Sequence, residues 1–387
     1  MVTLKKLSRY RHISMYLFLK SKKLFSLLFV AMLYGQAAHS ETIDTGSLAP
    51  IISIILNTEN QCSEVTQATT VIGDQIIETQ EQLNALKGTT KVDGNLLFLR
   101  TSTLTDFTPL DSLIEVTQTI RFAPRLLSEI SEINGFNCLE IVGGNFSIIS
   151  TENLERVSGF KSLKSVEGNF RISFLPELIS ISGFDSLTTA NGGFELLSNP
   201  ILTSIPNFSL MAQVNGTLNI SDNRILTSLT GFDRLTHING DLLILDNFQI
   251  VSTTDFESLV TVTQNLKISG NTWLNTIGNF KSLETIGGSL EIREEGILIF
   301  GGFPPGQRIT NINGFNSLTT IGEDLLITGN RYLTSIAGFT SLNSDDVSGT
   351  IRILTNSRLD CSNPEPSFVP VTDSFGNQVN CTQTIEP

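Results

Sequence analysis

Few side chains in this sequence of 387 residues have the type and spacing that catalysis requires. Of the three histidines, His12 and His39 lie in the first 40 residues, and His237 is alone in the rest of the chain. One histidine cannot form a His-rich metal site, and no G-x-S-x-G motif offers it a nucleophile to activate. We therefore expect His237 to be a solvated surface residue.

Paired carboxylates are the second chemical candidate, since glycoside hydrolases cleave their substrates with two acids and no histidine. Two adjacent pairs occur, Glu294 with Glu295 and Asp345 with Asp346. Neighbouring side chains of a strand point to opposite faces, so such a pair would meet at one bond only within a loop. Because no acid, base and cation converge in the sequence, we expect no catalytic residue, no metal site and no cofactor. A carbohydrate-active enzyme, either a polysaccharide lyase or a hydrolase, remains an alternative.

The composition is that of a folded, acidic protein. Apolar residues make up 40% and charged residues 16%, which excludes a disordered acidic chain. Seven of the 25 Lys and Arg lie in the first 40 residues, which contain no acid, so the remainder has 18 basic against 38 acidic residues, a formal net charge of −20. Such a body lacks the basic surface that nucleic acid or an anionic membrane requires, and we expect no nucleic-acid partner.

Residues 1–40 have the pattern of a signal peptide. A basic stretch ends at Lys23, ten mainly apolar residues follow, and the small residues that end at Ser40 predict cleavage before Glu41. The apolar stretch is shorter than the ~20 residues of a membrane span. The sequence therefore predicts a secreted, extracellular or cell-surface protein with no membrane span in the mature chain. A periplasmic location and an uncleaved anchor helix are the alternatives.

Four cysteines are an even number in a chain expected to be exported, and they predict two disulfides. They are Cys62, Cys138, Cys361 and Cys381. Three pairings are open, and we favour Cys62 with Cys138 and Cys361 with Cys381, one disulfide at each end. Free buried thiols are the alternative.

A repeat of 24 residues fills most of the chain. Counting from its Phe, each repeat has mostly apolar residues at +3, +6, +10, +12, +18 and +21. The alternation at +10 and +12 predicts a strand, and the spacings of three predict bends. The Phe positions are Phe136, Phe160, Phe184, Phe208, Phe232, Phe256 and Phe280, followed after a break by Phe315 and Phe339. Leu86 and Leu110 hold the same position in two divergent repeats, which gives eleven coils.

Two polar columns accompany the Phe column. The residue before each Phe is mainly Gly, Asn or Asp, types that tolerate a positive φ, and we expect a left-handed corner there. Asn recurs at +15, where its side chain, stacked on the next coil, would satisfy backbone groups that a bend leaves open. These residues are Asn199, Asn223, Asn247, Asn271 and Asn330, and Asn356 closes the series. A single coil cannot bury its apolar face, so the coils must stack into a solenoid, at ~4.8 Å per coil.

The full repeat reads G-F-x-S-L-x-x-I-x-G-x-L-x-I-x-x-N-x-x-L-x-x-I, for example from Gly314 to Ile336. It resembles the receptor L-domain repeat, a relative of the leucine-rich repeat found in growth-factor and insulin receptor ectodomains and in fungal cell-wall proteins. The resemblance runs from about Cys62 to Cys381 and implies an all-β fold, a right-handed β-helix or solenoid of about eleven 24-residue coils. An ordinary leucine-rich repeat differs, because it places Leu two residues after the Asn rather than three.

A short helix and a C-terminal segment are expected to cover the ends of the array, because an open end would expose unpaired strand edges. Thr79 followed by Gln82 forms a capping box, which predicts the N-terminal capping helix. The predicted organisation is therefore a signal peptide, an N-terminal segment with its cap, the L-domain-like solenoid and a C-terminal disulfide cap, at residues 1–40, 41–85, 86–359 and 360–387.

The period breaks once, between Phe280 and Phe315, where 35 residues replace 24. Eleven extra residues, drawn from about 294–307, must therefore leave the solenoid. Insertions of this kind form loops on one face, which is often the face that binds. The inserted stretch is apolar, and Trp273 and Tyr332 hold position +17 in the coils before and after it.

The predicted partner-binding edge consists of Trp273, Phe300, Phe303, Arg331 and Tyr332. The alternative is that the inserted loop folds back and buries its own apolar residues. The sequence thus predicts an exported, non-catalytic recognition or adhesion protein that binds a protein or glycan partner at the cell surface or outside the cell. Beside the enzyme, a purely structural envelope component is the other alternative.

Overall fold

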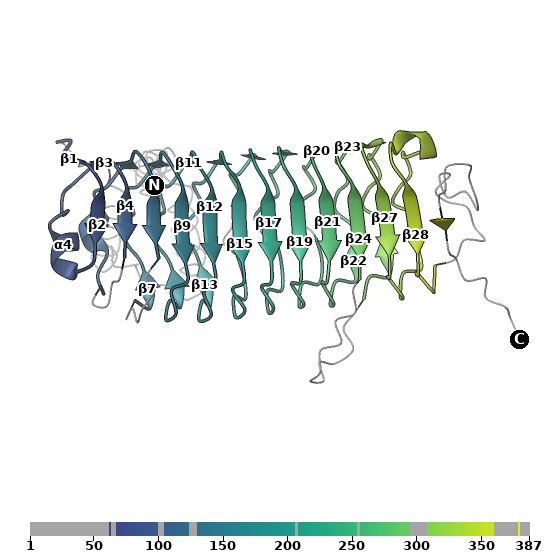
Figure 1. Ribbon diagram of the computed structural model, residues 1–387, viewed down its shortest axis with the longest axis horizontal. Coiled ribbons are helices and arrows are strands. Elements are labelled where there is room, and N and C mark those ends of the chain that lie inside the picture. Colours follow the sequence, from purple (N-terminus) through teal and green to yellow (C-terminus); the bar gives the residue numbers. More distant parts are fainter. Residues whose placement is uncertain are drawn as a thin grey trace, which may run out of the picture. The chain divides into compact units, whose positions relative to one another are not determined.

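The computed structural model describes residue 62 and residues 67–99, 104–123, 130–205, 208–253, 256–294, 308–359 and 378–379. From Cys62 onward the chain forms one compact unit. Within it, strands of successive repeats stack side by side in parallel, about 24 residues apart (Figure 1). The fold is a β-solenoid of about eleven coils with little helix, which confirms the predicted fold class.

The strand at positions +10 to +13 of the repeat builds a parallel sheet of 13 strands. In spatial order these are β2 (Gln75–Ile77), β4 (Leu96–Phe98), β6 (Ile120–Phe122), β9 (Phe146–Ile149), β12 (Phe170–Ser173), β15 (Phe194–Leu197), β17 (Leu218–Ser221), β19 (Leu242–Leu245), β21 (Leu266–Ser269), β24 (Leu290–Arg293), β27 (Leu325–Thr328), β28 (Ile351–Leu354) and β29 (Gln378–Val379).

Shorter strands at +5 and +6 build a second parallel sheet of 11 strands. They are β1 (Thr70–Ile72), β3 (Lys91–Asp93), β5 (Glu115–Val116), β8 (Ile141–Val142), β11 (Ser165–Val166), β14 (Thr189–Ala190), β16 (Gln213–Val214), β18 (His237–Ile238), β20 (Thr261–Val262), β23 (Thr285–Ile286) and β26 (Thr320–Ile321). The remaining elements are β7 (Glu132–Ile133), β10 (Arg156–Val157), β13 (Ser180–Ile181), β22 (Thr276–Ile277), β25 (Asn311–Ile312), α4 (Gln80–Asn84), η1 (Thr108–Leu110) and η2 (Ser344–Asp346).

A column of stacked Phe rings runs through the core. The ring centroids of Phe160 and Phe184 are 5.3 Å apart, and those of Phe184 and Phe208 are 6.2 Å apart. The column continues to Phe339, with centroids 5.1 to 5.7 Å apart and every ring buried. The rings superpose because equal positions of the repeat pair in register, as the sequence predicted.

The insertion leaves the pairing of the coils intact. β24 pairs with β27 in register, although 35 residues separate the partners. β22 likewise pairs with β25, Thr276 opposite Asn311. Glu294 and Arg308 are the described residues on either side of the inserted stretch, so the register resumes within a few residues of its end.

The ends of the solenoid agree with the sequence in two features. The backbone N–H of Gln82 donates to the side chain of Thr79, and the Gln82 side chain accepts from the Thr79 N–H, so the capping box starts α4. Cys62 and Cys138 form the favoured disulfide, whereas Cys361 and Cys381 lie outside the described residues. In the part of the chain that the structure describes, no helix has the length and apolar character needed to cross a membrane.

The sheets extend beyond the boundaries drawn from the sequence. β1 and β2 already belong to the two large sheets, so the solenoid starts before residue 86. At the other end β29 adds a strand from the 360–387 segment to the 13-stranded sheet. Residues 1–40, predicted to be a signal peptide, lie outside the described residues.

The predicted left-handed corner before each Phe is wrong for most coils. Gly183 and Gly231 have a positive φ, but Gly135, Gly159 and Gly314 do not. Glycine is needed in this column because the stacked coils leave no room for a side chain. A Cβ on Gly159 would lie 2.0 Å from the carbonyl oxygen of Gly135 in the preceding coil, so the stacked backbones approach too closely for a side chain.

The left-handed corner lies instead at +14, directly after the strands of the 13-stranded sheet. A positive φ occurs there at Ser150, Phe174, Ser198, Asp222, Asp246, Gly270 and Gly329, and at Thr355, which the register aligns with them two residues later in its coil. Most of these residues are small or polar, types that adopt this conformation at low cost, and Phe174 is the exception. In the coils of Gly135 and Gly159 a positive φ also occurs one residue after the predicted corner, at Phe136 and Phe160.

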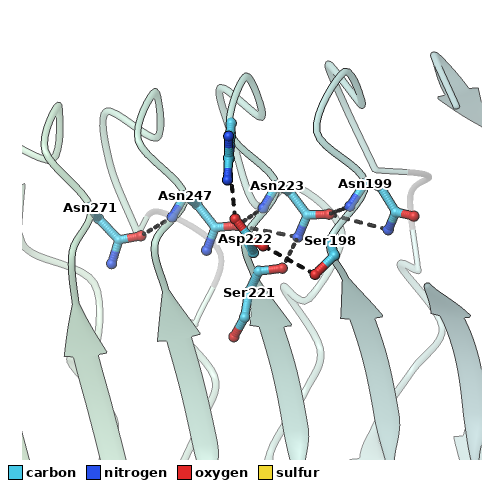
Figure 2. Close-up of polar contacts among 8 residues, drawn as sticks. Ser198, Asn199, Ser221, Asp222, Asn223, Asn247 and Asn271 are labelled. Atoms are coloured by element: carbon cyan, nitrogen blue, oxygen red, sulfur yellow. Dashed lines mark hydrogen bonds and ion pairs between the residues drawn. The ribbon is translucent and has the colours of Figure 1, made fainter. Parts of the chain in front are cut away.

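The predicted Asn ladder follows this corner and runs from Asn199 to Asn271 (Figure 2). The backbone N–H and the side-chain amide of Asn199 both donate to Oδ1 of Asn223, each at 3.2 Å. Nδ2 of Asn223 donates in turn to the carbonyl oxygen of Leu196, at 3.0 Å. Because these side chains are buried, the ladder satisfies backbone groups that the bend withdraws from both sheet and water.

Candidate functional site

We call the bend that follows each strand of the 13-stranded sheet, repeat positions +14 to +17, the Asn edge. It begins with the left-handed residue, continues with the buried Asn and ends with two positions whose side chains reach the surface. Because the strands pair in register, equal positions of successive coils stack along the solenoid. The predicted residues Trp273, Arg331 and Tyr332 all lie on this edge.

Tyr332, at position +17, lies between two arginines. Its ring centroid is 5.5 Å from the guanidinium carbon of Arg308 and 4.6 Å from that of Arg358. Strand pairing of Thr276 with Asn311, three residues after each +17 position, places Arg308 on the coil next to that of Trp273. We call Arg308, Tyr332 and Arg358 the Arg-Tyr stack. Cation–π contacts on both sides hold a partly exposed aromatic ring in place.

A buried carboxylate supports the Arg-Tyr stack from below the surface. The Glu294 side chain is 4% exposed, and its Oε1 accepts a hydrogen bond from Nη1 of Arg308 at 2.9 Å. Oε2 has no hydrogen-bond partner among the described residues. Burial raises the pKa of Glu294, and the nearby charges of Arg308 and Arg331 offset part of that rise. The ion pair also joins the two sides of the insertion.

The structure brings together only some of the predicted binding residues. Tyr332 and Arg331 are neighbours in one coil, and Trp273 lies two coils away in the same column. Phe300 and Phe303 lie outside the described residues. Arg308 and Arg358 were missed in the sequence. Counting that resumed after the insertion would have placed Arg308 at +17, in line with Trp273 and Tyr332. Arg358 is 19 residues after Phe339, and it aligns with Tyr332 because β27 and β28 pair residues that are 26 apart.

A second feature of the Asn edge was not foreseen from the sequence. The three coils that span residues 170–224 form an open surface depression of about 310 Å³. Its lining residues are Phe174, Pro176, Ser198, Pro200, Asp222 and Arg224. They come from positions +14 and +16 of three successive coils, so the repeat itself shapes the depression. The available signal was Pro at +16 in two successive coils, beside a Phe in the +14 column.

The polar side of this depression is a small hydrogen-bonded group. The Ser198 hydroxyl donates to Oδ2 of Asp222 at 3.1 Å (Figure 2). Nε of Arg224 donates to Oδ1 of the same carboxylate at 3.3 Å. The two side chains of this ion pair are exposed, so water screens their attraction. Asp222 is thereby held in one orientation at the rim.

The apolar side is Phe174, a residue held in an unfavourable conformation. Its φ is 58° and 48% of its surface is exposed. A bulky residue in the left-handed region costs about 1–3 kcal/mol, and strain of this kind concentrates at functional sites. The guanidinium carbon of Arg171 lies 5.7 Å from the ring centroid and Arg171 also pairs with Glu195. A strained, exposed aromatic ring marks the depression as a candidate site.

Among the described residues, the acids and the histidine singled out in the sequence do not gather in one cluster. His237 is exposed, as expected. Asp345 is exposed, and Asp346 accepts hydrogen bonds from Asn343 within η2. Glu295 lies outside the described residues. Within the described ranges, no three His, Cys, Asp or Glu residues gather where they could hold a metal ion. The groups that the Asn edge does present, aromatic rings, prolines and guanidiniums, are suited to binding.

Comparison with known proteins gives no further guide: no family model matches the chain, and no curated protein or solved structure matches it.

Proposed function

We propose that this chain is an exported recognition or adhesion protein that binds a protein or glycan partner through the Asn edge, without catalysis. The observation that carries the proposal is the Arg-Tyr stack, in which two guanidiniums hold Tyr332 at the edge beside the insertion. Tyr and Arg dominate the residues that contribute most to binding energy at protein interfaces. Insertions in solenoids likewise mark the binding face.

Export of the protein and its relationship to a known repeat family are part of the same proposal. The Cys62–Cys138 disulfide is typical of an oxidising compartment and supports export, and the proposal includes cleavage before Glu41. The 24-residue coil with its buried Asn supports a relationship to receptor L-domain repeats, proteins that work by recognition. The ligand would be a protein or a glycan at the cell surface or outside the cell.

The test uses mature protein, residues 41–387, on a glycan array and in pull-downs from extracellular material. We expect Tyr332→Ala to weaken capture of the bound partner by at least about tenfold, the effect of losing a residue worth ~1.4 kcal/mol. Gln249→Ala is the matched control, because Gln249 holds position +17 in a coil away from the insertion.

Three results would contradict the proposal. Equal binding by the Tyr332→Ala and Gln249→Ala variants would mean that the Arg-Tyr stack does not contact the partner. New reducing ends released from polysaccharides by the mature protein would favour the enzyme alternative. Absence of any captured partner would favour a structural envelope component.

A further inference from the structure

The depression around Phe174 has the size of a site for a small ligand. Its volume of about 310 Å³ is at the lower end of the range for ligand sites, 300–1,000 Å³. It is open to solvent and three coils wide, and the coils are spaced by ~4.8 Å. A flat ligand of one or two rings, lying along the solenoid axis, fits these dimensions better than a helix of a partner protein.

The walls combine an aromatic face with two rigid aliphatic ones. Phe174 is 48% exposed although it is large and apolar, and Pro176 and Pro200 lie beside it on the same edge. The other residues of the +14 column with a positive φ are Ser, Asp, Gly or Thr, which adopt this conformation more easily. Phe136 and Phe160 also have a positive φ, but their rings are buried in the core, whereas Phe174 leaves its ring in solvent, where it can contact apolar C–H groups of a ligand.

The rim offers hydrogen bonds of both kinds and little net charge. Asp222 is an acceptor already oriented by Ser198 and Arg224, and Arg224 keeps further donors in solvent. Because the Asp222 and Arg224 charges cancel, neither an anionic nor a cationic ligand gains a strong attraction. Arg171, whose guanidinium carbon lies 5.7 Å from the Phe174 ring centroid, is engaged by Glu195 at 3.3 Å.

These features together match a sugar ring. A pyranose presents C–H groups on its flat faces and hydroxyls around its edge, and each hydroxyl both donates and accepts. It can therefore cover Phe174 while donating to Asp222 and accepting from Arg224. A Pro-rich peptide lacks the N–H donor at each of its prolines, so it offers the carboxylate of Asp222 fewer donors than the hydroxyls of a sugar do.

We propose that this depression is a subsite for an uncharged pyranose ring of a polysaccharide, with Phe174 stacking on the sugar face and Asp222 with Arg224 binding its hydroxyls. The inference rests on the proposed recognition function and narrows one of its ligands to neutral carbohydrate. It concerns a different part of the Asn edge from the Arg-Tyr stack.

The test is saturation-transfer NMR and calorimetric titration of the mature protein with uncharged oligosaccharides of glucose, mannose, xylose and N-acetylglucosamine. We expect at least one of them to bind and to receive magnetisation at its ring C–H protons. Phe174→Asn removes the ring while Asn tolerates the left-handed conformation, and it should weaken binding at least tenfold. Asp222→Asn should weaken binding several-fold.

Two controls separate this site from the rest of the surface. Val251→Ala removes an apolar side chain that is also 48% exposed, and it should leave binding unchanged. Tyr332→Ala should leave oligosaccharide binding unchanged as well, even where it abolishes capture of another partner.

Several outcomes would overturn the inference. The first is that no uncharged oligosaccharide binds, and the second is that Phe174→Asn binds sugar as well as the wild type does. The third is that a Pro-rich peptide or heparin binds and the neutral sugars do not. If Tyr332→Ala still abolished partner capture in those cases, the proposed recognition function would stand without this subsite. If Phe174→Asn lost sugar binding and Tyr332→Ala kept full capture of the partner, the sugar subsite would be supported and a role of the Arg-Tyr stack in binding would not.

Discussion

The Asn edge is built in two ways, and the regular coils differ from those beside the insertion. From Asn199 to Asn271 neutral amides donate and accept in series, so every coil is satisfied by the next. In the coil that carries the insertion, position +14 holds Glu294, a buried carboxylate paired with Arg308. The amide ladder resumes only at Asn330 and Asn356. A buried ion pair thus lies next to the ladder position where the repeat is interrupted, and the +15 residue of that coil lies outside the described residues.

This difference teaches where a repeat protein can place unusual chemistry. Because equal positions of successive coils stack on one another, each position favours a side chain that fits every coil, such as the buried Asn. A buried carboxylate and an exposed, strained aromatic residue appear where a column departs from its usual type, as at Glu294 and Phe174. Both departures lie beside the surface groups that we propose to bind partners.

Loss of an amide from the middle of the ladder should have the largest effect on stability. Asn223→Ala removes the acceptor of two Asn199 donors and the donor to Leu196, all in a buried site. We expect a loss of about 3–5 kcal/mol in the free energy of unfolding, measured by urea denaturation. Asn239→Ala is the control, because it removes an exposed amide that also bonds to the preceding coil. Equal losses in the two variants would mean that burial of the ladder is unimportant.

Removal of the arginine beside the insertion should have an intermediate effect. Arg308→Ala leaves the buried Glu294 carboxylate without its close partner, and we expect a cost of about 2 kcal/mol near pH 7. The corresponding change in the regular coils, Arg224→Ala, breaks an exposed ion pair and should cost under about 0.5 kcal/mol. Thermal unfolding of both variants checks the contrast. A larger loss of stability in Arg224→Ala than in Arg308→Ala would contradict the expected difference between the two ion pairs.

The pH dependence of stability should identify the buried carboxylate directly. Burial raises the folded-state pKa of Glu294 above its ordinary value of 4.5, so folding favours the protonated form. The stability that protonation provides is complete below pH 4.5 and is lost as the pH rises through the folded-state pKa. The melting temperature of Glu294→Gln, taken relative to wild type, should therefore rise with pH from about 4 to 7. A difference that is constant or falls over this range would mean that Glu294 is not destabilised by burial.

Relief of backbone strain in the regular coils should have the smallest effect and the opposite sign. Phe174→Asn places a residue that tolerates a positive φ at this corner, and we expect stabilisation of up to about 1 kcal/mol. Calorimetric melting measures it, and Phe174→Val, which keeps an unsuitable side chain, should show no gain. A clear loss of stability in the Asn variant would mean that the exposed ring contributes to packing rather than to binding.

Counting residues predicted the parts of the molecule that repeat. The Phe column and the Asn ladder followed from spacing because each coil must offer the same side chain to the next. The glycine column was misread because glycine serves both positive φ and close contact, and composition cannot separate the two. At Gly159 only the distance to Gly135 shows that contact is the reason.

Features that combine several coils could not be read from the sequence in the same way. Phe174, Pro200 and Arg224 are ordinary residues in three different repeats, and they form a depression only because the register aligns positions +14 and +16. Arg308 was missed because the insertion shifts the count. Burial of Glu294 depends on how the chain closes the coil after the insertion, which spacing does not specify.

Hydroxyl-radical footprinting tests most directly whether the Asn edge is the recognition surface. A protein of residues 41–387 would be oxidised with and without a saturating amount of the uncharged oligosaccharide that binds best. We predict protection at positions +14 to +17, with Phe174 and Pro200 among the protected residues, and unchanged labelling of Leu243 on the outer face of the 13-stranded sheet. Protection of Leu243 with no change at Phe174 would contradict this account of the protein.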